Sequence, residues 1–166
     1  MRITQYYEYI SWKNKNGEEY RAIIDELVGQ HFRDAYDDAL ESERRKCLDK
    51  FCETIMIGTL MYEKEYEITK KCRADAVLGF EKNAEGHIAP ESIKKIVEFK
   101  PKKVTYAHVG QAYGYYCQLR AQYGIKPQLF IVGKEFEQEA LNYISILKNE
   151  NGVEVHTFDW SPFFTM

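Results

Sequence analysis

The spacing of hydrophobic residues divides the chain into a helical first part and a mixed second part. Between about residues 30 and 59, apolar side chains recur every three or four positions, as in Phe32, Ala35, Tyr36, Ala39 and Leu40. This spacing places them on one face of a helix. We therefore expect a long amphipathic helical stretch, with a break near Cys47 or Gly58, preceded by a turn at "NKNG" (14–17) and a helix at 18–27.

From residue 60 onwards the period changes. The segment "MYEKEYEITKKCRADAVLGFEK" alternates and predicts two strands, and "NAEG" (83–86) predicts a turn. The next strand spans 93–100 and stops at Pro101, and "AHVGQAYGYYCQLRAQYG" predicts a helix closed by Gly124. A short apolar strand "QLFIVG" of the kind covered on both faces, a helix at 135–149 and a last strand "VEVHTFDW" complete the order. This order predicts one α/β domain, with a helical part at about 18–59 and a core at about 60–160 that holds a central mixed β-sheet flanked by helices.

Charge excludes one class of function and leaves another open. The 166 residues carry a net charge of −3, which argues against a protein that coats nucleic acid generally. Within ten residues, however, only Glu98 opposes the lysines at positions 94, 95, 100, 102 and 103, whereas residues 34–43 carry five acids and no base. Each run fits a solvated face, and the basic run also fits a local site for an anion.

The cysteines and the hydropathy pattern give expectations about the compartment. The four cysteines, Cys47, Cys52, Cys72 and Cys117, form no CxxC pair, so a zinc knuckle is not expected. We expect them to be free thiols in a reducing compartment. The first fifteen residues lack the apolar region of a signal peptide, and no apolar run approaches eighteen residues. We expect a cytoplasmic (intracellular) protein that does not associate with membranes.

Two charges stand in a strand that is otherwise suited to the core. In "IVEFK", Glu98 and Lys100 share one face and Phe99 points to the other. Burying these two charges costs desolvation energy unless they are paired with opposite charges or solvated. They are solvated if the end of the strand near Pro101 is exposed to water. Asp75 in "CRADAVLGF" is a second acid among small and apolar residues. If Asp75 and Glu98 are neighbours in the sheet, their repulsion favours a shared cation, and oxygen ligands suit magnesium or manganese.

Two further features are compatible with a site and also with ordinary structure. Gln111 and Tyr115 lie four residues apart on the predicted helix, so they share a face that suits a phosphate or a sugar, or they are a surface amide and a core tyrosine. His31 lies on or beside an apolar helical stripe, where it is either a metal ligand or a hydrogen-bonded core residue. The other histidines, His87, His108 and His156, are interpreted as surface or structural residues.

Taken in order, these segments resemble the PD-(D/E)xK nuclease superfamily, and more narrowly its RecB-type branch, which includes the CRISPR-associated exonucleases. The resemblance runs over about residues 28–132. The matching segments are "GQHFRDAYDDAL" with His31, "RADAV" with Asp75, "VEFK" with Glu98 and Lys100, and "QAYGY" with Gln111 and Tyr115. Ala74 stands where the superfamily name has proline. The cysteines do not follow the pattern that holds an iron–sulfur cluster in some relatives, so no cluster is expected.

The resemblance implies a restriction-endonuclease-like fold and a metal-dependent DNA nuclease. By it, Asp75 and Glu98 bind Mg²⁺ or Mn²⁺ together with His31 and the backbone carbonyl of Phe99, and Lys100 orients the attacking water or stabilises charge. The residues that hold the DNA are Gln111, Tyr115, Lys102 and Lys103. No helicase motif is present, so the nuclease acts alone, as a homo-oligomer or with a protein partner.

Two other interpretations stay open at this level. One is a nuclease-like fold without activity that serves as a DNA- or protein-binding module. The other is a plain α/β protein in which the E-x-K triplet arose by chance. Loss of cleavage on replacing Glu98 or Lys100 would separate the nuclease from both.

Overall fold

The computed structural model describes residues 2–6, 9–13, 19–23, 46–101 and 103–159. The chain forms two compact units, Met1–Leu48 with Pro162–Met166, and Asp49–Ser161. Whether both units act as the single domain predicted from the sequence stays a prediction.

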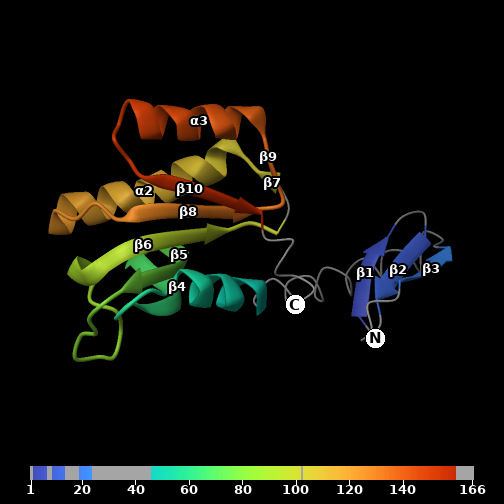
Figure 1. The fold of residues 1–166 in the computed structure, drawn as a ribbon, viewed down its shortest axis with the longest axis horizontal. Helices are drawn as coiled ribbons and strands as arrows, with labels where there is room; N and C mark the ends of the chain where they lie inside the picture. The colour runs from blue at the N-terminus through green and yellow to red at the C-terminus, as the bar shows by residue number, and fades with distance from the viewer. Residues whose placement is uncertain (1, 7–8, 14–18, 24–45, 102, 160–166) are drawn as a thin grey trace. The chain divides into compact units, whose positions relative to one another are not determined.

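The described part of the first unit is a three-stranded antiparallel sheet, in the order β1 (Arg2–Tyr6), β2 (Tyr9–Lys13) and β3 (Glu19–Ile23) (Figure 1). The helix predicted at 18–27 is therefore wrong at β3, whose five residues pair with β2 from Tyr9↔Ile23 to Lys13↔Glu19. A segment this short has no decisive period of its own, and pairing with a neighbouring strand determines its conformation. The predicted turn at 14–17 and most of the predicted stretch at 30–59 lie outside the described residues, but 46–55 is helical as expected.

The second unit is built on a five-stranded mixed sheet in the order β10-β8-β6-β5-β4. Neighbours β4–β5 and β5–β6 are antiparallel, whereas β6–β8 and β8–β10 are parallel. The strands are β4 Met61–Thr69, β5 Cys72–Gly79, β6 Ile93–Phe99, β8 Gln128–Gly133 and β10 Val155–Asp159. The predicted mixed sheet flanked by helices is confirmed.

Two helices connect the parallel strands. The helix α2 (Tyr106–Tyr123) lies between β6 and β8 and ends at Gly124, which has a left-handed φ of 69° and donates its amide to the Arg120 carbonyl, as the sequence predicts. The helix α3 (Gln138–Asn149) begins three residues later than expected. Residues before it form the short strand β9 (Glu135–Phe136), which pairs with β7 (Lys103–Val104). A three-residue 3-10 helix, η1 (Pro90–Ser92), precedes β6.

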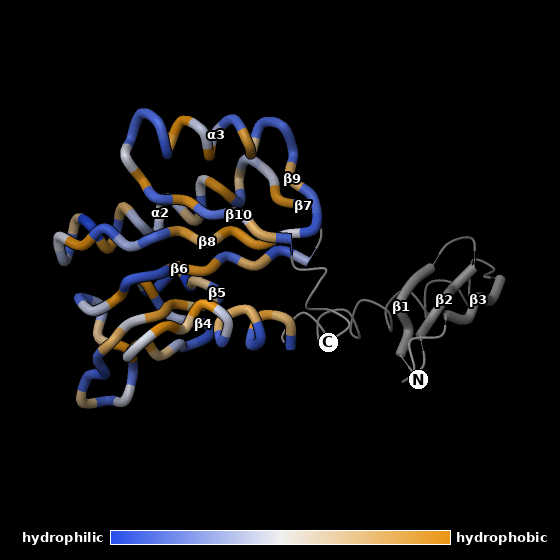
Figure 2. The backbone as a smooth tube through the Cα atoms, viewed as in Figure 1, coloured by the Kyte–Doolittle hydropathy of each residue, from blue (hydrophilic) through white to orange (hydrophobic). Residues whose placement is uncertain are grey.

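Side chains of β8 show how both faces of the sheet are covered. Leu129 and Ile131 belong to the buried cluster that contains residues of α2 and α3. Phe130 points the other way, where its ring lies 6.2 Å from the ring of Phe51 in the helix 46–55. Hydrophobic residues accordingly run along β6 and β8 in the middle of the sheet (Figure 2). This agrees with the prediction that "QLFIVG" is covered on both faces.

Among the described residues, β4 is the last strand on one side of this sheet. Its Lys64, Glu65 and Glu67 are exposed, and Glu65 has a φ of 51°, in the left-handed region that non-glycine residues seldom adopt. In the part of the chain that the structure describes, none of the helices has the length and apolar character needed to cross a membrane.

Candidate active site

The pairing of β5 with β6 brings the two predicted carboxylates together. These strands are antiparallel and Ala76 is opposite Val97, so Asp75 and Glu98 follow as the next opposite pair. Glu98 is also level with Ile131 of β8, whose side chain faces α2. Alternation then places Glu98 and Lys100 on the α2 side of the sheet and Phe99 on the other side.

At this end of the two strands, carboxylates take the place of backbone carbonyls as hydrogen-bond acceptors. The Phe99 amide donates to Asp75 Oδ2 at 2.7 Å, and the Asp75 amide donates to Glu98 Oε1 at 3.4 Å. The ammonium of Lys100 lies 3.2 Å from Glu98 Oε2, and its own amide donates to the Val132 carbonyl at 2.8 Å. The three predicted catalytic side chains therefore converge where β5 begins and β6 ends, with Glu98 buried and Asp75 and Lys100 partly exposed.

Glu98 is the most buried of these groups, with only 2% of its surface exposed. Burial, and next the negative charge of Asp75, raise the pKa of Glu98 from 4.5 to about 7, although the Lys100 ammonium acts in the opposite direction. Binding of a proton or of a cation would stabilise a carboxylate in this position. The site therefore combines a desolvated acid, a second acid and an amine within hydrogen-bonding distance.

The donor atoms fit a hard divalent cation. Asp75 and Glu98 supply carboxylate oxygens, and the Phe99 carbonyl is a further oxygen on the same strand end. Among the residues that the structure describes, no three His, Cys, Asp or Glu side chains gather as metal ligands, and His31 lies outside those residues. A cation here would have two protein carboxylates and would take water for much of its coordination shell.

The helix α2 presents the predicted DNA-binding pair differently at its two positions. Gln111 is exposed, whereas Tyr115 is only 3% exposed and its hydroxyl donates to the Arg73 carbonyl at 2.8 Å. Burial raises the pKa of Tyr115, and the charges of Glu98 and Asp75 raise it further. Tyr115 thus ties α2 to β5 two residues from Asp75. Of the two predicted basic contacts, Lys103 is exposed in β7 and Lys102 lies outside the described residues.

His108 is a residue near the site that the sequence interpretation set aside. Its Nδ1 accepts the Thr105 amide at 3.0 Å, and its own amide donates to Thr105 Oγ1 at 3.4 Å, so the two residues form a capping box at the start of α2. Burial lowers the pKa of His108, and the charge of Lys100 lowers it further. The available sequence signal was a threonine followed three residues later by a side chain with an acceptor atom.

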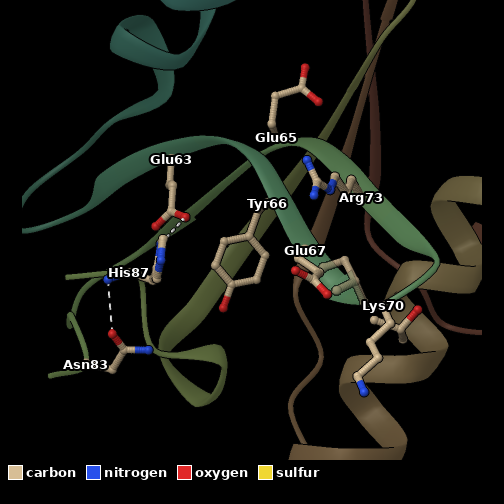
Figure 3. A pocket seen from close by; sticks show the side chains of 10 residues that line it. Glu63, Glu65, Tyr66, Glu67, Lys70, Arg73, Asn83 and His87 are labelled. Atoms are coloured by element: carbon tan, nitrogen blue, oxygen red, sulfur yellow. Dashed lines mark hydrogen bonds and ion pairs between the residues drawn. The ribbon is translucent and has the colours of Figure 1, made fainter. Parts of the chain in front are cut away.

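A pocket of about 470 Å³ lies on the β4–β5 hairpin and the loop after β5 (Figure 3). Tyr66 stands between Arg73 on one side and the pair formed by Glu63 and His87 on the other, with His87 Nδ1 2.9 Å from Glu63 Oε2. Arg73 precedes Asp75 by two residues, so one wall of the pocket leads toward the carboxylates. The wall residues carry both signs of charge, which does not select one class of ligand.

Five chains of solved structures are similar to this one, and they include the following three. The structure of an EndoMS–dsDNA complex has a TM-score of 0.49 and 13% identity, covering 70% of this chain and 45% of that chain. A repair endonuclease from Pyrococcus abyssi has a TM-score of 0.48 and 17% identity, covering 69% and 46%. EndoMS in apo form has a TM-score of 0.39 and 12% identity, covering 91% and 58%.

The chain spans about half the length of these proteins. No protein-family model matches it, and no curated protein matches it in sequence. At these identities and TM-scores, the structural similarity does not indicate the activity of this protein. Inferences about function therefore rest on the side chains of the site.

Proposed function

We propose that this protein is a metal-dependent DNA nuclease of the PD-(D/E)xK type, close to the RecB-like branch. The observation that carries the proposal is the meeting of Asp75, Glu98 and Lys100 where β5 begins and β6 ends, with Glu98 only 2% exposed. A structural ion pair alone gives no reason for a second carboxylate beside a desolvated one, because the two repel each other. Two oxygen ligands for a divalent cation with an amine beside them are a combination that can support phosphodiester hydrolysis.

In the proposed mechanism, Asp75 and Glu98 would hold Mg²⁺ or Mn²⁺, with the Phe99 carbonyl and His31 as further ligands. A bound cation of this kind polarises a phosphate and lowers the pKa of a bound water. The Lys100 ammonium, 3.2 Å from Glu98 Oε2, would orient the attacking water or stabilise the negative charge that develops on the phosphate. The hydrogen bonds that the Asp75 and Phe99 amides donate keep β5 and β6 in register at the site.

The DNA is proposed to run along α2 and β7. Gln111, Tyr115, Lys102 and Lys103 are the proposed contacts. Of these, Gln111 and Lys103 are exposed and free to meet a phosphate backbone, whereas the Tyr115 hydroxyl is already a donor to Arg73. Contacts from lysine to phosphate weaken with salt, so binding is expected to fall as the salt concentration rises.

The test is a cleavage assay on linear, circular and single-stranded DNA with Mg²⁺ and with Mn²⁺. Wild type is compared with Glu98→Gln and Lys100→Gln, and with Glu139→Gln, which makes the same charge change as Glu98→Gln at an exposed position of α3. We expect cleavage by wild type and Glu139→Gln, and a loss of about 100-fold or more in the two site variants. The three substrates also separate exonuclease from endonuclease activity.

Absence of cleavage by wild type with either metal contradicts the proposal, as does equal cleavage by wild type and both site variants. Wild type that binds DNA tightly without cutting it would instead support the inactive binding module.

A further inference from the structure

The helix α2 begins with a capping box in which histidine occupies the position usually held by glutamate or glutamine. Thr105 Oγ1 accepts the His108 amide, and His108 Nδ1 accepts the Thr105 amide. Because a backbone N–H is the donor in the second bond, Nδ1 must carry a lone pair. The box is therefore complete only while the imidazole is neutral.

The hydrogen bond between the Thr105 amide and His108 Nδ1 lies at the end of the short connection that leads from Lys100 to α2. The Lys100 amide donates to the Val132 carbonyl at 2.8 Å, and the Glu137 amide donates to the Val104 carbonyl at 3.0 Å. The Thr105 amide then meets His108 Nδ1 at 3.0 Å. Only four residues separate Lys100 from Thr105, so the start of α2 limits where the Lys100 backbone and side chain can lie.

Three charged groups, Lys100, Glu137 and Asp75, act on His108, and the Lys103 backbone forms a hydrogen bond with it. Burial is the largest influence and lowers the pKa of His108 below 6.5, and the positive charge of Lys100 lowers it further. Glu137 at the start of α3, the Lys103 backbone and Asp75 on β5 act in the opposite direction. The imidazole is thus neutral at pH values above 6.5 and is sensitive to the charge balance of the candidate active site.

We propose that His108 is a positioning residue that keeps Lys100 in place only while its ring is neutral, so that acidification releases the start of α2 and lowers nuclease activity. This inference rests on the proposed nuclease function. When Nδ1 takes a proton, it becomes a donor facing the donor N–H of Thr105, and the hydrogen bond is lost. The effect reaches the reaction through Lys100, whose charge acts on His108.

The chain offers a matched pair of variants. His108→Gln keeps an acceptor at the position where glutamine completes a capping box, and it removes the titrating group. His108→Ala removes the acceptor at every pH. For each variant and wild type, kcat and KM for DNA cleavage are measured between about pH 5 and about pH 8.

We expect wild type and His108→Gln to be similar near pH 8, with wild type losing more activity than His108→Gln as the pH falls below 6.5. Taking the ratio of the two rates removes the titration of groups that both proteins share. For His108→Ala, which lacks the acceptor at every pH, we expect kcat to be about fivefold below that of His108→Gln throughout and to approach that of wild type as the pH falls, with little change in KM. Parallel pH profiles for wild type and His108→Gln would overturn the inference.

A second measurement does not depend on activity. Hydrogen-exchange protection of the Thr105 amide in the metal-free protein should fall on acidification in wild type and stay constant in His108→Gln. Protection that does not differ between the two proteins overturns the role of His108. If protection behaves as expected but wild type never cleaves DNA, the nuclease assignment fails while the hydrogen-bond switch is supported.

Discussion

Replacing Glu98 by glutamine should stabilise the metal-free protein at neutral and alkaline pH while removing its activity. The amide has nearly the shape of the carboxylate and keeps an oxygen that can accept the Asp75 amide. It cannot ionise, so it carries no charge into a position that is only 2% exposed. The substitution therefore removes a desolvated charge that faces Asp75, at the cost of the ion pair with Lys100.

The size of the effect follows from the raised pKa of Glu98. A rise from 4.5 to about 7 corresponds to about 3 kcal/mol, at about 1.4 kcal/mol per pH unit. Between these values the folded protein keeps a proton on Glu98 that the unfolded chain has released. The free energy of unfolding of wild type therefore decreases as the pH rises from 4.5 to 7, and the glutamine variant lacks this decrease.

The measurement is urea unfolding with a chelator present, at about pH 4.5 and about pH 8, for wild type, Glu98→Gln and the exposed control Glu139→Gln. Glu98→Gln should exceed wild type by up to about 3 kcal/mol at the higher pH and by little at the lower one, whereas Glu139→Gln should follow wild type. Added Mn²⁺ should then stabilise wild type and not Glu98→Gln. The reasoning is refuted if Glu98→Gln is the less stable protein at pH 8, or if the difference does not change with pH.

Two further substitutions test how the fold around the site is held, and both are checked by urea unfolding. Lys95→Met should cost about 1 to 2 kcal/mol, because the Lys95 ammonium donates to the Ile55 carbonyl at 2.8 Å, at the end of the helix 46–55; Lys94→Met, which removes an exposed lysine, is the control. Gly79→Ala should cost about 1 to 3 kcal/mol, because the new methyl group would meet the buried Ile88 side chain at 2.5 Å, whereas Gly114→Ala has open space and should not destabilise. Equal stability of each variant and its control would contradict these two accounts.

Local patterns predicted most elements of the second unit because its strands are long or strongly apolar. The alternation in 61–79 and the apolar run of β8 both correspond to strands in the structure. The failures are short elements whose conformation depends on pairing with another strand, which is close in the sequence for β3 and distant for β9. β3 is a strand because it pairs with β2, and the residues at 135–136 form β9 because they pair with β7.

In the candidate site, too, local sequence patterns predicted some features and missed others. Alternation predicted that Glu98 and Lys100 share a face, and the structure brings them together with Asp75. Helical spacing correctly placed Gln111 and Tyr115 one turn apart, but it carries no information on depth, and Tyr115 proved to be buried against Arg73. His108 was set aside although Thr105 stands three residues before it, because the capping-box motif usually has glutamate or glutamine at that position.

The left-handed conformation of Glu65 bears on how the molecule behaves at high concentration. A flat outer strand offers a row of unpaired backbone groups to which a strand from another molecule can add. In β4, the φ of 51° at Glu65 interrupts that row in mid-strand, and exposed Lys64 and Glu67 place charges on either side of it. We therefore expect the residue that distorts the strand to protect this edge of the described sheet from aggregation, and a β-branched residue at position 65 to favour a straighter strand and self-association.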